Sequence, residues 1–457
     1  MSFNKRGVLH KCCETIGKYL LSSFANSPLM NANKTDMRIA KGYHLALALI
    51  TLLIAVLPKM VAIGFAVMFA ISIIGLLKKQ FAFRVNVVIA AFMTFYLFFL
   101  IGVCFTNDFP NAMKVLEYRL SFIIIPMLFV FQPRFKIDLA YPILGLALGI
   151  VCISIVGFTE AFGLFQLSHN ALTSFRSSNI CIDHPTYYAA FTTVASAGVW
   201  FLYKKNFPGF TLLKVIPFLL FAVVMILLSY SMSALLFLFA VAVFLLFKWI
   251  YTELNKIAAV AMLVIAPVGI FFVITNTPVL KDEFNNSSVA LQEYSTNPME
   301  FIHGEGEVTS GDKIRLIMWT VTAKECLTHP LGVGTGNVDE NLSQALLQVN
   351  QIEMSIKTQN NEIRYNPHNQ FLQTALELGF LGLTIFLFIL VKSAQWGIRS
   401  RNGLLVLVVS CLSFNCLFES MLQRQTGIVF FTFWIVLLTM DLGQTNFLKE
   451  QANATES

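Results

Sequence analysis

Long apolar runs separated by short polar segments make up most of the chain. A transmembrane helix needs about 20 apolar residues, and the runs predict roughly twelve such helices. The first two and the fourth runs are short, so ten or eleven helices are the alternative. The pattern therefore predicts an all-α polytopic membrane protein. The predicted helices span residues 43–58, 60–77, 85–104, 119–132, 140–163, 185–203, 211–229, 233–250, 257–275, 370–391, 403–420 and 425–441.

Composition agrees with a membrane protein. Of the 457 residues 56% are apolar and only 12% are charged, whereas soluble proteins carry about 25% charged residues. The 32 Lys and Arg outnumber the 25 Asp and Glu, but they lie between the apolar runs. This excess indicates membrane topology and not nucleic-acid binding. The eight Cys are scattered, which predicts neither a disulfide framework nor a metal site.

The distribution of Lys and Arg predicts the orientation. Most of them fall on one side of the predicted helices, which we assign to the cytoplasm. The prediction is a cytoplasmic tail at 1–42, nine transmembrane helices within 43–275, and a periplasmic loop at 276–369. Three further transmembrane helices lie within 370–441, and a second cytoplasmic tail covers 442–457.

The long periplasmic loop between the ninth and tenth helices is the only soluble segment large enough to hold chemistry. Polar residues at 285–288 predict irregular structure. A helix is predicted from about 310 to 327, where His329-Pro330 ends it, and a second from 338 to about 357. The apolar face of the first helix is predicted to consist of Ile314, Ile317, Met318 and Val321.

The sequence Asn366-Pro367-His368 leads directly into the tenth predicted helix. Asn is a strong N-cap and Pro is favoured in the first turn, so we expect His368 in that turn. Gly379 and Gly382 would share its face and let another helix approach closely, whereas Glu377 would point the opposite way. A helix N-terminus disfavours imidazolium and attracts anions, which suits a neutral general base beside a phosphate. The alternative is a His that merely hydrogen-bonds lipid headgroups or loop carbonyls.

Two motifs resemble a known family. His368-Asn369, nine residues, Gly379, two residues and Gly382 are similar to the H-N-x9-G-x-x-G signature of the O-antigen ligase and O-antigen polymerase superfamily of bacterial envelope glycosyltransferases. Arg315 and Trp319, followed by the segment 329–337, resemble that family's R-x3-W and H-P-L-G-x-G-x-G-N stretch. The likeness at the level of motifs covers about residues 230–425.

The resemblance implies a metal-independent, inverting transfer of a glycan from an undecaprenyl-pyrophosphate carrier to an acceptor hydroxyl, with no cofactor. His368 would activate the hydroxyl and Arg315 would hold the leaving pyrophosphate, because guanidinium pairs well with phosphate. Arg315 on a solvated helix face is the alternative. Trp319 and Asn369, which belong to the same motifs, are candidate substrate-binding residues. The enzyme would act at the periplasmic face of the bacterial inner membrane.

One position departs from the family pattern. Ligases usually carry an Arg in an S-R-x3-L pattern between the seventh and eighth helices, and this chain has Met232 there. Met cannot bind phosphate, so another cation is expected to replace it, and loss of activity is the alternative. The candidates are Arg176, Arg119 and Arg424, each of which could instead be an interfacial cation near lipid phosphate.

A second His repeats the pattern of a cap followed by Pro. His184-Pro185 precedes the sixth predicted helix and resembles an H-P-[ST]-Y segment of some family members. We expect His184 to have a structural or acceptor-positioning role. Glu419 lies near Arg424 in the sequence, and an ion pair between them is expected because isolated charges there are costly. No Cys or His spacing predicts a metal.

Ligase and polymerase differ only in the acceptor, which is a lipid A core sugar or the end of a growing lipid-linked glycan. Attachment of the glycan to a protein side chain is a third option. A carrier or flippase for lipid-linked glycans is the rival from another class, but it should place ionisable groups near the bilayer midplane. Here these residues crowd the helix ends and the long loop, which favours chemistry at the membrane surface.

Overall fold

The computed structural model describes residues 34–168, 184–229, 231–276, 278–303, 311–359 and 365–456. It is 82% helical, which confirms the predicted all-α class. The only strands in these residues form a short antiparallel pair, β1 (Phe81–Phe83) and β2 (Phe131–Pro133), with Ala82 opposite Gln132.

Every predicted transmembrane segment is a helix, with ends that differ from the prediction by a few residues at most positions. In the N-terminal part these are α2 (Lys34–Val56), α3 (Val61–Leu77) after the short η1 (Pro58–Met60), α4 (Val87–Val103), α6 (Ser121–Val130), α7 (Ala140–Ser168), α9 (Pro185–Lys204), α10 (Leu212–Ser229), α11 (Met232–Trp249) with η2 (Ile250–Leu254), and α12 (Lys256–Asn276). A further helix, α5 (Phe109–Arg119), lies between the third and fourth predicted segments and was not predicted. The C-terminal part adds α18 (Gln370–Arg399), α19 (Gly403–Asn415) and α20 (Gln425–Glu456).

Fewer helices than predicted are long and apolar enough to cross a membrane. Seven in the described residues meet both conditions, and they fall in α2, η1 with α3, α7, α10, α11 with η2, α18 and α20. Among the other helices, Val87–Val103, the stretch Lys256–Gly269 of α12 and Gly403–Asn415 are apolar but shorter. The 10 residues of α6 rise only about 15 Å, which is half of the apolar thickness of a bilayer. Length therefore supports seven spanning helices, and a count of about twelve stays a prediction.

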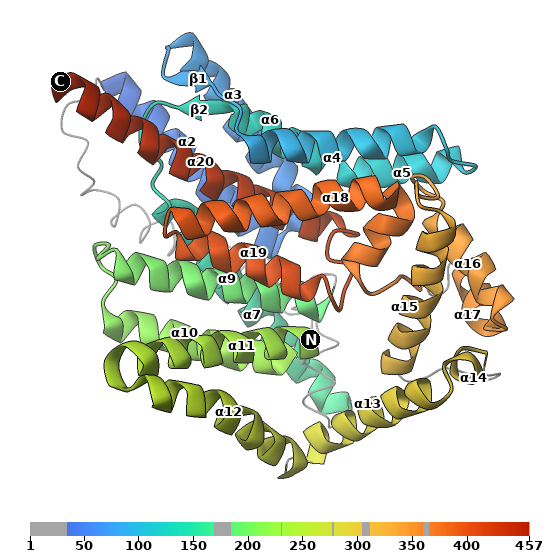
Figure 1. The fold of residues 1–457 in the computed structure, drawn as a ribbon. Helices are drawn as coiled ribbons and strands as arrows, with labels where there is room; N and C mark the ends of the chain where they lie inside the picture. Colours follow the sequence, from blue (N-terminus) through green and yellow to red (C-terminus); the bar gives the residue numbers. More distant parts are fainter. Residues whose placement is uncertain are drawn as a thin grey trace.

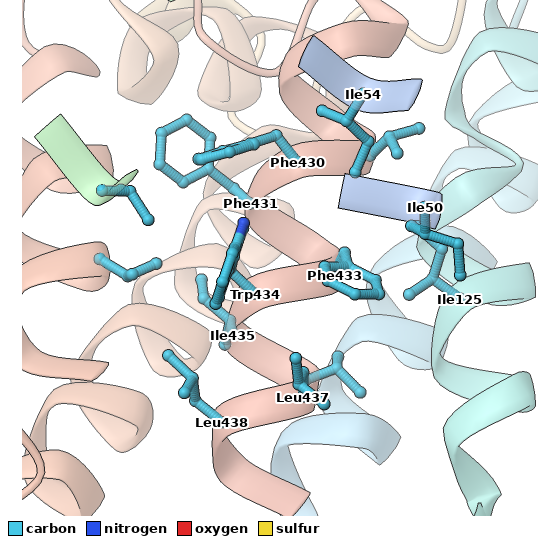
Figure 2. Close-up of a cluster of buried hydrophobic side chains, with 14 of the residues drawn as sticks. Ile50, Ile54, Ile125, Phe430, Phe431, Phe433, Trp434, Ile435, Leu437 and Leu438 are labelled. Carbon is cyan, nitrogen blue, oxygen red and sulfur yellow. The ribbon is translucent and has the colours of Figure 1, made fainter. Parts of the chain in front are cut away.

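The main core surrounds α20. Phe430, Phe431, Phe433 and Trp434 of this helix are fully buried, and they meet Ile50 of α2 and other apolar side chains from neighbouring helices (Figure 2). A helix that is apolar on all sides is stable only when it is surrounded. Its central position in the bundle (Figure 1) follows from this composition.

The long loop folds into helices with a core of their own. They are α13 (Pro278–Thr296), α14 (Pro298–Ile302), α15 (Gly311–Thr328), α16 (Val338–Gln348) and α17 (Ile352–Gln359), and α15 to α17 lie together at one end of the bundle (Figure 1). Ile317, Met318 and Val321 of α15 are buried in this second core and Ile314 is packed against it. The predicted helix and its apolar face are thus confirmed.

Two predictions for this loop are wrong. Residues 285–288 are helical within α13, because the polar stretch is part of a longer exposed helix that begins at Pro278. The predicted helix at 338–357 is divided into α16 and α17. The break follows from Asn350, whose φ of 59° is left-handed, a conformation that Asn tolerates and that ends helices.

Candidate active site

His368 precedes α18 instead of lying in its first turn. Its φ is 45°, and its backbone N–H donates to Asn366 Oδ1 at 2.7 Å. The N-cap is Asn369, whose Oδ1 accepts from the N–H groups of Phe371 and Leu372 at 3.0 and 3.1 Å. The expected position was wrong because Asn366 closes a local turn and leaves the capping to Asn369. The Asn369 side chain is therefore engaged in capping α18.

The His368 ring lies against a buried carboxylate. Its Nδ1 is 3.2 Å from Oε2 of Glu419, which lies in the turn between α19 and α20 and is 8% exposed. Burial raises the pKa of Glu419, but the hydrogen bond from His368 and the charges of His368 and His184 outweigh burial, so the pKa is lowered overall. The expected ion pair with Arg424 was wrong: in the described residues Glu419 pairs with the two histidines.

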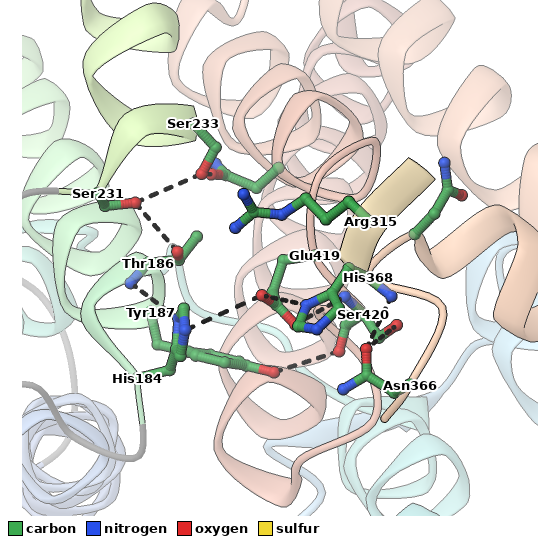
Figure 3. A network of polar contacts seen from close by, with 12 residues as sticks. His184, Thr186, Tyr187, Ser231, Ser233, Arg315, Asn366, His368, Glu419 and Ser420 are labelled. Atoms are coloured by element: carbon green, nitrogen blue, oxygen red, sulfur yellow. Dashed lines mark hydrogen bonds and ion pairs between the residues drawn. The ribbon is translucent and has the colours of Figure 1, made fainter. Parts of the chain in front are cut away.

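His184 reaches the same carboxylate from another helix. It is the N-cap of α9 with Pro185 after it, as predicted, and its Nδ1 accepts from the N–H of Thr186 at 3.4 Å. Its Nε2 is 3.9 Å from Glu419 Oε2. Figure 3 shows both rings converging on Glu419. Two histidines that are far apart in the sequence thus share one buried negative charge.

Arg315 of α15 faces the same space. A cavity of about 290 Å³ is lined by Arg315, His368, Glu419 and His184. Arg315 Nη1 donates to Asp312 Oδ1 at 3.1 Å, while its Nε is buried and finds no acceptor among the described residues. Such an unpaired N–H is costly unless a ligand accepts from it. Trp319 does not line the cavity. Other lining residues include Tyr187, Tyr365, Asn366, Gln423 and Arg424.

The other candidate arginines have different positions. Arg424 lines the cavity, and Arg176 lies outside the described residues. Arg119, at the end of α5, is buried and pairs with buried Glu377 of α18, with its guanidinium 4.2 Å from the centre of the Phe99 ring. Glu377 does not line the His368 cavity, but it holds Arg119. The structure therefore brings Arg315 and Arg424 to His368 and keeps Arg119 apart.

Met232 supplies no charge at the junction of α10 and α11. It is 42% exposed, whereas its neighbours Ser231 and Ser233 are buried. Their hydroxyls connect Thr186 of α9 with Asn415 of α19 through hydrogen-bond distances of 3.0 to 3.3 Å (Figure 3). This neutral network joins α9, α11 and α19.

The two glycine motifs meet through their backbones. α18 breaks at Gly379, whose φ and ψ are 70° and −176°, and the segment after α15 runs along the break. A Cβ on Gly379 would lie 2.4 Å from the carbonyl carbon of Leu331, and a Cβ on Gly332 would lie 2.5 Å from the nitrogen of Gly379. Hydrogen bonds join Phe380 N to Pro330 O, Val333 N to Leu376 O and Gly334 N to Glu377 O.

This contact corrects the expected helix crossing. We expected the glycines to share a helical face with His368 and to receive another helix, but Gly379 interrupts the helix and receives a loop. A φ and ψ of this kind are accessible essentially to Gly alone. The two motifs thus form one backbone junction that fixes α15 relative to the start of α18.

Comparison with known proteins points to the same family. Residues 217–387 match the family model of the O-antigen ligase domain. The resemblance to the O-antigen ligase and polymerase superfamily is confirmed. No curated protein matches the chain. The O-antigen ligase match includes Arg315, His368 and Gly379, whereas His184 and Glu419 lie outside it.

Sequence reasoning did not place Glu419 beside His368. A carboxylate close to an apolar run must have a partner, and that signal was present in the sequence. The nearest basic residue along the chain was nevertheless the wrong partner, because the fold brings His368 and His184 closer. Within the described residues no group of three or more His, Cys, Asp or Glu is arranged to hold a metal ion.

Proposed function

We propose that this membrane protein transfers a glycan from an undecaprenyl-pyrophosphate carrier to an acceptor hydroxyl, as an O-antigen ligase with the lipid A core as acceptor. The match to the O-antigen ligase domain supports an enzyme of the glycosyltransferase type. The observation that carries the proposal is the cavity that contains His368, Glu419 and Arg315 together. It combines a base, a group that orients the base, and a cation for a leaving phosphate.

The contact with Glu419 prepares His368 to act as a base. An ionised carboxylate only accepts hydrogen bonds, so the neutral imidazole that faces it carries its proton on Nδ1. Its Nε2 then has a free lone pair. This nitrogen accepts the proton of the acceptor hydroxyl, and Glu419 stabilises the imidazolium that forms, as a buried carboxylate does in other dyads of this kind.

Arg315 and Arg424 supply positive charge for the leaving group. The acceptor oxygen forms a bond to the anomeric carbon, and the bond from that carbon to the pyrophosphate oxygen breaks with its electron pair. Attack opposite the leaving group inverts the anomeric configuration. The Arg315 Nε that lacks an acceptor is suited to a pyrophosphate oxygen, because guanidinium binds phosphate in a bidentate manner. The charge that develops would be stabilised by guanidinium without a metal ion.

The location follows from the predicted topology. We propose that the protein lies in the bacterial inner membrane with both termini in the cytoplasm and the cavity on the periplasmic face. Lipid-linked glycans and lipid A core are membrane-bound substrates, so an opening near the membrane surface suits both. His184 caps α9 beside the cavity, and we assign it to positioning the acceptor.

The test is a reconstituted transfer reaction. The purified protein is mixed with lipid-linked glycan and with either lipid A core or a second lipid-linked glycan, and free undecaprenyl pyrophosphate and the product are measured. Transfer to lipid A core supports a ligase, whereas elongation of the glycan alone would make the protein a polymerase. Movement of the lipid across vesicles without bond formation would indicate a carrier. Loss of activity with EDTA would contradict the metal-free scheme.

Matched variants test the residues. His368→Ala and Arg315→Ala should each abolish product while the protein still inserts into the membrane, because neither side chain belongs to a packed core. His303→Ala, an exposed His of the same loop, and Lys324→Ala, an exposed cation of α15, serve as controls. Near-normal turnover in His368→Ala would show that His368 is not the base.

A further inference from the structure

A second cavity adjoins the first. It has a volume of about 260 Å³ and lies where α5, α16 and the start of α18 meet, and Gln423 lines both cavities. It continues into a third cavity of about 520 Å³, because Asn111, Lys114, Gly336 and Asp339 line both of these. The second cavity therefore lies next to both the cavity of His368 and the third cavity.

An unpartnered acceptor faces the second cavity. Gln373 of α18 lines it, is only 3% exposed, and its Oε1 finds no donor among the described residues. Leaving a buried carbonyl oxygen without a hydrogen bond is unfavourable. A ligand that donates a hydroxyl hydrogen to this oxygen would remove that cost.

The remaining lining fits a sugar better than a phosphate. Lys114 and Arg119 are balanced by Asp339 and Glu377, so the lining carries no net charge. A pyrophosphate would need an excess of cations, which this cavity lacks. Tyr118 adds a ring that is 50% exposed and presents an apolar face with a polar tip. Planar polar groups beside an aromatic face suit a ring with many hydroxyls and apolar C–H groups.

We propose that this second cavity binds a saccharide unit of the glycan beside the one that reacts, with a sugar hydroxyl donating to Gln373 Oε1 and the sugar ring packed on Tyr118. This proposal rests on the proposed function, and it adds that the enzyme selects its substrate by a sugar outside the reacting cavity. The buried pair of Arg119 and Glu377 keeps one wall of the cavity in place.

Binding of free glycan tests this inference separately from catalysis. The envelope glycan of the source cells, released from its lipid by mild acid, is titrated into the purified full-length protein in nanodiscs and followed by saturation-transfer NMR. Wild type and His368→Ala should bind alike. Gln373→Met, of similar shape but without the acceptor, should weaken binding about tenfold, as expected for the loss of one buried hydrogen bond.

The controls separate binding from folding. Gln292→Met, an exposed Gln of α13, should bind as wild type does. Tyr118→Phe should keep the affinity and Tyr118→Ala should lower it about tenfold, since the ring supplies the contact. The thermal midpoint of Gln373→Met should not fall, because the lost oxygen has no partner in the protein. Absence of glycan binding in wild type, or unchanged affinity in Gln373→Met, overturns the inference even if His368 proves essential for transfer.

Discussion

Replacement of Glu419 by Gln tests how the buried carboxylate acts on His368. At 3.2 Å and an effective dielectric constant of about 20, a carboxylate attracts an imidazolium by about 5 kcal/mol. The Gln amide oxygen can still accept from Nδ1, and a neutral hydrogen bond has about half the strength of a charged one. The variant therefore loses about 2.5 kcal/mol of stabilisation when the imidazolium forms.

This loss corresponds to about a hundredfold in rate. The loss of rate should appear in kcat and not in KM, because the His368 imidazolium forms in the transition state and is absent from the enzyme–substrate complex. Initial rates of undecaprenyl pyrophosphate release over a range of donor and acceptor concentrations provide both constants. Glu293→Gln, which removes a 54% exposed carboxylate at 3.9 Å from Lys313, is the matched control and should behave as wild type does.

Two results would refute the reasoning. An unchanged kcat in Glu419→Gln, together with an inactive His368→Ala, would mean that the carboxylate does not assist the base. A raised KM at constant kcat would mean that Glu419 only holds substrate or shapes the cavity. If Glu419→Gln lost all activity and its thermal midpoint also fell, glycan binding in the same preparation would distinguish a misfolded protein from a catalytic defect.

The remaining predictions concern stability, measured as thermal midpoints of the purified protein. Gly379→Ala should destabilise the protein by about 1–3 kcal/mol through its backbone conformation alone, and by more through the clash of the new Cβ with Leu331. Gly403→Ala, with open space around it, should not destabilise the protein, and equal midpoints for the two variants would contradict a tight backbone junction at Gly379. Glu377→Gln should cost about 3–5 kcal/mol because it leaves Arg119 buried without a countercharge, and adding Arg119→Met should restore much of this. The pKa of Glu419 lies below its ordinary 4.5. Its ionised form therefore stabilises the protein fully above pH 4.5, and this stabilisation is lost as the pH falls through the lowered pKa. Wild type should consequently lose more stability on acidification than Glu419→Gln does.

The position of His368 shows how far local rules reach. The motif from Asn366 to Asn369 contains two residues that can cap a helix, and the rules rank them nearly equally. Choosing between them depends on where the chain must enter α18. In the structure Asn369 also donates to the carbonyl of Leu417 at 3.2 Å, a contact with a distant turn that no local pattern contains.

The sequence by itself predicted most of the helices, because long apolar runs bounded by caps, Pro and Gly are typical of helices. It also singled out His368, Arg315 and the glycine motifs as the residues to which the proposed function assigns its chemistry. Only the tertiary structure decided that Glu419 meets both His368 and His184, that Glu377 holds Arg119, and that a loop fills the break at Gly379. These contacts join segments far apart in the chain, and packing of the whole bundle, not local preference, selects among the charged partners available to each group.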